Sequence, residues 1–121
     1  MTISKKYRFT AESELKPLAL NRGTCYASDM ITVEGFKVGF LYRQEPDFNG
    51  DSGWRFLTGF ETDYYMEQSD NFGLFDVNVI ANCDPEIADY LDQPVGSAWG
   101  RDPSIGNKFT EIKDFDTTDE G

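Results

Sequence analysis

Residues 45–65 read EPDFNGDSGWRFLTGFETDYY and join a polar, turn-rich loop to an aromatic, strand-like segment. The pair Asn49–Gly50 is a strong turn signal within this loop. The next residues alternate in character, so that Trp54, Phe56 and Phe60 share one face of an extended chain. The stretch therefore predicts a loop that leads into a half-buried β-strand.

The segment before this loop, Phe36 to Arg43, is the clearest strand in the sequence. Ten residues, Gln44 to Gly53, join it to the aromatic segment at Trp54 to Phe60, so we expect a long-looped antiparallel hairpin. A loop of this length is longer than a usual hairpin loop and is more often functional. The residues that share one face of the first strand are Phe36, Val38, Phe40 and Tyr42.

The rest of the chain predicts a single α+β domain over residues 1–121, with a mostly antiparallel sheet and two short helices. Asp76 and Asp84 are suitable N-caps for the two helices, and Pro85 suits a first helical position. We expect the acidic residues 114–121 to fray. The other predicted segments are short strands at 5–9, 23–28, 95–100 and 108–112, a helical turn at 11–15, and a connection at 29–35 with a β-prone run at 31–33.

The formal net charge of −11, from 22 acidic and 11 basic residues, argues against binding to a nucleic-acid backbone, which requires a basic surface. The charge is also uneven, because residues 45–76 contain eight acidic residues and a single base, Arg55. An acidic surface attracts basic protein partners, although the same charge can simply keep a domain soluble. The basic residues within 1–22 could alternatively neutralise this acidic span.

Histidine is absent from the sequence, which excludes Ser-His-Asp and Cys-His catalysis and histidine-containing zinc sites. Cys25 and Cys83 lack the spacing of a zinc or redox site, and we interpret them as buried thiols. We therefore expect no catalytic residues, no metal and no cofactor. We find no signal peptide and no membrane-spanning stretch, so we expect a cytoplasmic protein.

Two other kinds of chemistry remain open. Acid pairs such as Asp47 with Asp51, or Glu61 with Asp63, could act as the carboxylates of a hydrolase. The series Asp47-x-Asn49-x-Asp51 places oxygen ligands at alternate positions, as calcium loops do. A helix-loop-helix calcium site would, however, need Gly at position 52 and Glu at position 58, where this chain has Ser and Thr.

We expect a partner-binding surface in the acidic span, displayed by the hairpin. Aromatic rings beside charged groups are favoured at protein interfaces. Arg55 either orients the surrounding carboxylates for a partner or simply neutralises them as a strand residue, and we favour the structural role. The residues of the expected surface are Asp47, Asp51, Glu61, Asp63, Tyr64, Tyr65 and Glu67.

Several short motifs resemble a bacterial domain-of-unknown-function family, classed as the thirty-third group of predicted immunity proteins in polymorphic-toxin systems. The resemblance covers residues 25–101 and rests on GFKVGFLYR at 35–43, EPD at 45–47, DSGWRF at 51–56, DNF at 70–72, NCDP at 82–85 and PVGS at 94–97. We expect Glu45, Pro46, Gly53, Trp54, Arg55, Phe56, Asp84 and Pro85 to have structural roles. The resemblance implies a non-catalytic binder that neutralises a toxin, and toxins often present basic surfaces. The alternatives are a calcium-binding domain, a carboxylate-dependent hydrolase and a housekeeping interaction domain.

Overall fold

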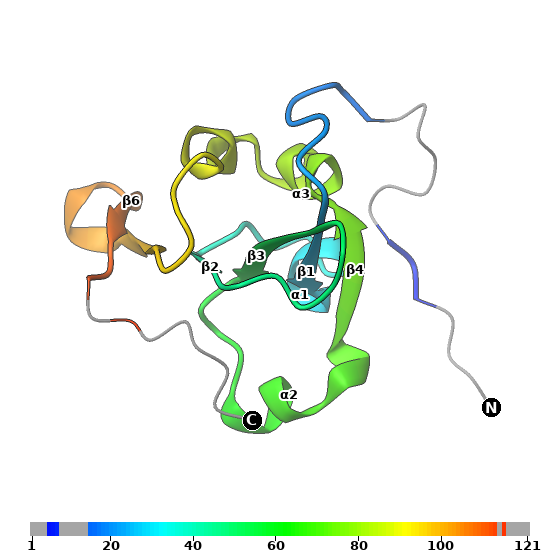
Figure 1. Ribbon diagram of the computed structural model, residues 1–121. Helices are drawn as coiled ribbons and strands as arrows, with labels where there is room; N and C mark the ends of the chain where they lie inside the picture. The colour runs from blue at the N-terminus through cyan, green and yellow to red at the C-terminus, as the bar shows by residue number, and fades with distance from the viewer. Residues whose placement is uncertain (1–4, 8–14, 114, 116–121) are drawn as a thin grey trace.

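The computed structural model describes residues 5–7, 15–113 and 115, which form a six-stranded sheet with short helices (Figure 1). The strand order is β4-β1-β3-β2-β5-β6. Within the described residues, β1 and β3 pair in parallel and the other four neighbouring pairs are antiparallel. This confirms the predicted α+β class. The strands are β1 Thr24–Ser28, β2 Phe40–Arg43, β3 Asp51–Leu57, β4 Phe72–Asp76, β5 Ala98–Asp102 and β6 Lys108–Glu111.

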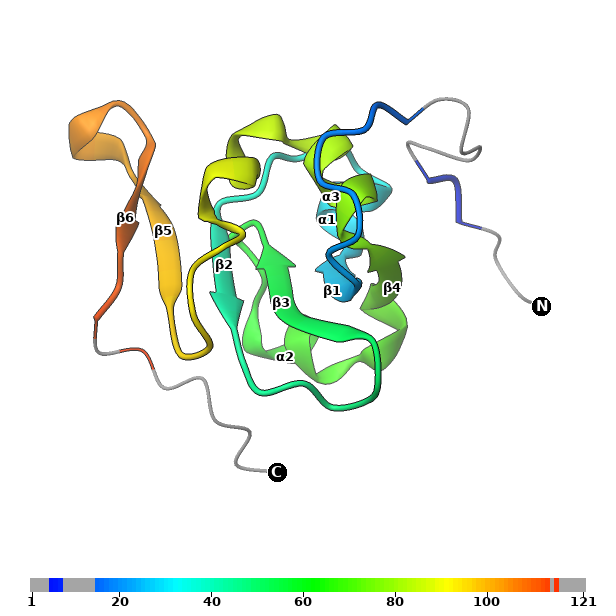
Figure 2. The same ribbon diagram turned by 45° about the horizontal axis from the view of Figure 1, so that its top comes forward.

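The helices lie on both sides of this sheet (Figure 1, Figure 2). The helix α3 and the yellow-green 3-10 helix η3 cover one side, whereas α2 lies on the other. Within the described part of the chain, the helices fall short of the length and apolar character that a membrane crossing requires. The helices are α1 Asp29–Thr32, α2 Asp63–Glu67 and α3 Val77–Cys83, with 3-10 turns η2 Ser69–Asn71, η3 Pro85–Tyr90 and η4 Pro103–Ile105.

Both helices predicted from their N-caps are present. The Asp76 carboxylate accepts a hydrogen bond from the backbone N–H of Asn78 at the start of α3. Asp84 accepts one from the N–H of Glu86 at the start of η3, and Pro85 occupies the first turn. The second helix is 3-10 rather than α.

The hairpin is also confirmed, because β2 and β3 pair antiparallel across a loop formed by residues 44–50. β2 is shorter than expected, because the N–H of Val38 donates to the Asp84 carboxylate (3.1 Å) and the segment before Phe40 is not a strand. β3 has the expected length but begins and ends three residues earlier, at Asp51 and Leu57. The predicted aromatic faces are therefore wrong in part. Leu41 is the fully buried residue of β2, whereas Phe36 and Phe60 are 49% and 75% exposed.

Other local predictions have mixed outcomes. The β-prone run at 31–33 is wrong, since Ser28 accepts a hydrogen bond from the Met30 N–H and starts α1 there. The strands expected at 23–28 and 108–112 are confirmed as β1 and β6, and the one at 95–100 begins later, at Ala98. The described residues 5–7 and 15 belong to no strand or helix. The remainder of the segments predicted at 5–9 and 11–15 and most of the tail at 114–121 lie outside the described residues.

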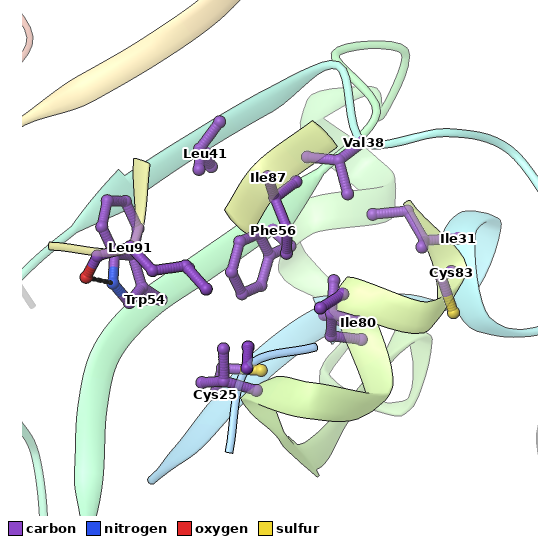
Figure 3. Close-up of a cluster of buried hydrophobic side chains, with 14 of the residues drawn as sticks. Cys25, Ile31, Val38, Leu41, Trp54, Phe56, Ile80, Cys83, Ile87 and Leu91 are labelled. Atoms are coloured by element: carbon purple, nitrogen blue, oxygen red, sulfur yellow. Dashed lines mark hydrogen bonds between the residues drawn. The ribbon is translucent and has the colours of Figure 1, made fainter. Parts of the chain in front are cut away.

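The hydrophobic core fills the space between the sheet and the helices α3 and η3 (Figure 3). Trp54 and Phe56 of β3 are its largest members, and their rings stack with centroids 6.1 Å apart. The indole N–H of Trp54 donates to the carbonyl oxygen of Leu91 at 3.3 Å, which fastens η3 to the sheet. Cys25 and Cys83 are both buried, as predicted. This core occupies one side of the sheet, and α2 lies on the other.

Candidate partner-binding surface

The exposed hairpin loop is held in place at its end by a buried ion pair. The two terminal nitrogens of the Arg55 guanidinium, Nη2 and Nη1, donate to the Asp51 carboxylate at 2.8 and 3.0 Å. The Asp51 side chain is 0% exposed and that of Arg55 8%. The backbone N–H groups of Asp47 and Gly53 also donate to Asp51, each at 2.9 Å. Asp51 thus fixes the loop, and its burial removes it from the expected contact surface.

The electrostatics of this pair keep Asp51 ionised. Burial by itself raises the pKa of the Asp51 carboxyl, but the hydrogen bonds from Arg55 and from the two backbone N–H groups lower it by more. The resulting pKa is about 2, against an ordinary value of 3.8. Arg55 is also placed over the ring of Tyr26, 4.7 Å from its centroid. The favoured structural interpretation of Arg55 fits this geometry.

Asp47 lies at the outer edge of the same cluster. Its carboxylate is 3.3 Å from the Arg55 guanidinium and accepts a hydrogen bond from the Gln44 amide at 3.1 Å, while its side chain is 54% exposed. Asp47 and Asp51, the two carboxylates of the series considered as a calcium loop, therefore both face the Arg55 guanidinium. Among the described residues, no group of three or more Cys, Asp or Glu side chains is arranged to hold a metal ion. Glu45 and Pro46 lie exposed at the start of the loop.

Glu61 closes the other end of the hairpin. Its carboxylate accepts hydrogen bonds from the backbone N–H groups of Thr58 and Gly59, at 2.9 and 3.0 Å. Burial raises the pKa of the Glu61 carboxyl, but hydrogen bonds, chiefly from the Thr58 backbone and the Ser28 side chain, outweigh it and leave the pKa lowered. Because the two oxygens are engaged by the backbone, Glu61 caps the end of β3 and is only partly accessible.

Three exposed acids of the span lie on α2 and η2, which the sequence did not predict as helices. Thr62 is the N-cap of α2, since its hydroxyl accepts from the Tyr65 N–H at 3.1 Å. Asp63 and Glu67 are four residues apart and so lie on the same side of α2. Both are exposed, and so is Asp70 of η2. Together with Tyr64, which is 74% exposed, they form what we call the α2 acidic face.

Tyr65 differs from its neighbour Tyr64. Its ring meets Phe72 edge-on at 5.8 Å, and its hydroxyl accepts a long hydrogen bond from Ser28 at 3.5 Å. Burial raises the pKa of this hydroxyl. Tyr65 therefore holds α2 against the sheet, whereas Tyr64 projects outward.

In the described part of the basic opening segment, the ion pairs are made with acids outside the α2 acidic face, although Lys5 also lies close to Asp70. Within the described residues, Lys5 pairs with Asp29 at 2.8 Å and Arg22 pairs with Asp92. Lys5 also donates to the backbone carbonyl of Asp70, which leaves the Asp70 carboxylate outside the contact. The described ion pairs therefore join the opening segment to acids outside residues 45–76.

A second candidate surface is a hollow of about 870 Å³ near the ends of β2 and β3. The exposed aromatic residues Phe36 and Phe60 lie on its wall. Its charges are mixed: Arg101 contacts Glu86 at 2.8 Å, Lys37 lies 4.0 Å from the same carboxylate, and Lys108 also lines the hollow. Sequence reasoning missed Arg101, which also holds the buried carboxylate of Asp84 at 2.7 Å. Because bases outnumber the one acid in this lining, the hollow suits a basic partner less well than the α2 acidic face does.

The comparisons with known proteins place the chain in a family. The family described as "Immunity protein Imm33 domain" matches residues 25–113, which includes every motif on which the resemblance rested. No curated protein and no solved structure was found to match the chain. Immunity proteins are typically non-catalytic, in line with a surface built from structural and exposed acids. The match covers well over half of the 121 residues, and the protein therefore belongs to the Imm33 immunity protein family, whose members are implied to neutralise toxins.

Proposed function

We propose that the protein neutralises a bacterial toxin by direct contact through the α2 acidic face. The observation that carries this proposal is the exposure of Asp63, Glu67 and Asp70 beside the projecting ring of Tyr64. An aromatic ring amid charges of one sign is suited to protein recognition, because the ring supplies buried area and the charges supply orientation. Asp47, Glu61 and Tyr65 support this surface from the hairpin and the sheet.

The partner that fits such a face is basic. A cluster of carboxylates speeds the encounter with a positively charged protein and disfavours binding of an acidic protein. Neutralisation by contact needs no catalytic group, so a chain without histidine can perform it. We place this activity in the cytoplasm, where the buried thiols of Cys25 and Cys83 would remain reduced.

Reversal of two charges on the α2 acidic face should abolish protection. We expect the double variant Asp63→Lys/Glu67→Lys to bind the cognate toxin domain roughly 100-fold more weakly, because two attractive contacts become repulsive. The measurement is the growth of cells that co-express the toxin domain with each variant, together with the dissociation constant of the purified pair.

The matched control is Asp89→Lys/Glu111→Lys, which makes the same change in net charge at exposed positions on η3 and β6. The control should protect cells as the unaltered protein does. If both double variants protect equally well while remaining folded, the α2 acidic face is not the contact surface. Loss of protection by both variants to the same degree would mean that only net charge matters, which also contradicts the proposal.

A further inference from the structure

A small hollow of about 250 Å³ lies between the sheet and α2, next to the α2 acidic face. Its floor comes from the four neighbouring strands β4, β1, β3 and β2, and its outer wall comes from α2 and η2. Ligand sites for drug-sized molecules occupy about 300–1,000 Å³, so this hollow suits a single side chain better than a cofactor. The residues that line it are Tyr26, Tyr42, Arg55, Leu57, Met66, Ser69 and Phe72.

The lining calls for an apolar occupant. Rings, Leu57 and the thioether of Met66 make up most of the wall. The one charged residue in the lining, Arg55, already donates to Asp51 through its two terminal nitrogens and stacks on Tyr26. A polar guest would therefore lose its water without gaining a strong partner, whereas an apolar guest gains contact area.

The same face of the sheet already holds one aromatic side chain. Phe115 packs against Phe40 and Tyr42, with ring centroids 5.1 Å apart in each case. Tyr42 belongs both to this cluster and to the lining of the hollow. The open face of the sheet is thus built to receive rings, and the hollow is the part of it beside Tyr42 that is still unfilled by the described chain.

The charges beside the hollow indicate which residues should flank the inserted side chain in the partner's segment. Met66 and Ser69, which form the outer wall, are each followed directly in the chain by an exposed acid, Glu67 and Asp70. A segment that inserts a side chain here must pass these carboxylates. Basic residues would pair with them, and acidic residues would be repelled.

From this arrangement we infer that the hollow receives one apolar side chain, aromatic or long aliphatic, from a segment of the toxin that carries Lys or Arg on both sides of it. The inference rests on the proposed function and adds to it one inserted apolar side chain of the toxin, which we call the anchor. A buried apolar anchor surrounded by a charged rim is the usual composition of an energetic centre in a protein interface. The α2 acidic face would then form the rim of this centre.

Filling the hollow from its edge tests the anchor in the toxin complex. Ser69 is exposed, so Ser69→Trp can place an indole over the opening without altering the core. We expect this variant to bind the toxin domain at least roughly 10-fold more weakly although Asp63 and Glu67 are intact. The matched control is Ser104→Trp on η4, another exposed serine outside the lining, which should bind normally.

A probe that does not depend on the toxin separates the anchor from the proposed function. The peptides Lys-Lys-Phe-Lys-Lys and Lys-Lys-Ser-Lys-Lys differ only in the anchor, and each can be titrated into the protein while amide NMR shifts are followed. The phenylalanine peptide should shift the amides of Tyr26, Leu57 and Phe72, and the Ser69→Trp variant should lose those shifts. The serine peptide should affect the acidic rim alone.

The outcomes distinguish the two claims. Equal shifts from both peptides, or normal toxin binding by a folded Ser69→Trp variant, would overturn the anchor while leaving a charge-based contact in place. Anchor-specific shifts with the phenylalanine peptide, combined with no toxin binding by the unaltered protein, would support the hollow and contradict the proposed function.

Discussion

Replacing Arg55 by alanine is expected to destabilise the protein by about 3–5 kcal/mol, since it would leave the buried Asp51 carboxylate without its cation. The Asp51 side chain is 0% exposed, so solvent cannot take over the lost contacts. Two charge-assisted hydrogen bonds and the stacking on Tyr26 disappear together. The measurement is the free energy of unfolding from urea titration at neutral pH, where Asp51 is fully ionised.

The control for this variant is Lys37→Ala, which also removes one positive charge. Lys37 is exposed and lies 4.0 Å from Glu86, so its loss should change the free energy of unfolding by less than about 0.5 kcal/mol. If Arg55→Ala proves as mild as Lys37→Ala, the ion pair does not hold the loop as described. A native-like far-UV spectrum at low urea concentration would show that the variant still folds.

Substitution of Gly53 by alanine should be still more disruptive and should impair folding of the hairpin. Gly53 has φ +87°, which side-chain-bearing residues rarely adopt, and a Cβ atom there would lie 2.2 Å from the backbone oxygen of Gln44. That neighbour cannot move aside, because the Gln44 N–H donates to the Gly53 carbonyl and closes the hairpin. We expect a loss of more than about 3 kcal/mol, read as a fall in melting temperature or as failure to accumulate folded protein.

Gly50→Ala separates the steric effect from the conformational one. Gly50 lies in the same loop with φ +92°, but a Cβ atom there meets nothing within 4 Å. Its substitution should therefore cost only the left-handed backbone penalty, roughly 1–2 kcal/mol. Similar melting temperatures for the two variants would contradict the close approach of Gly53 to Gln44.

The features that the sequence predicted correctly are those set by neighbouring residues. Asp76 and Asp84 cap helices because an aspartate side chain reaches an N–H group two residues ahead, which depends little on the rest of the fold. The alternation at Trp54 and Phe56 likewise places both rings on the core side of β3. The family resemblance is confirmed by the family match over residues 25–113.

The features that the sequence did not predict depend on contacts between distant segments. The side chain of Val38 fits a strand, yet its N–H group bonds to Asp84, 46 residues later. The burial of Asp51 follows from the central position of β3 between β1 and β2, which no local pattern encodes. For the same reason the sequence predicted that the hairpin displays the whole surface, whereas its residues 63–67 form the helix α2. The one sign in the sequence that acids gather after the hairpin was the close spacing of Glu67 and Asp70.

Hydrogen–deuterium exchange of the protein, alone and with its cognate toxin domain, tests most directly whether the α2 acidic face is the contact surface. Amides that a partner covers exchange more slowly, and the exchange pattern reports which segment is covered. We predict that binding slows exchange across residues 61–72, on α2 and η2, and leaves η3 at 85–90 unchanged. Slower exchange at 85–90 with no change across 61–72 would contradict the account.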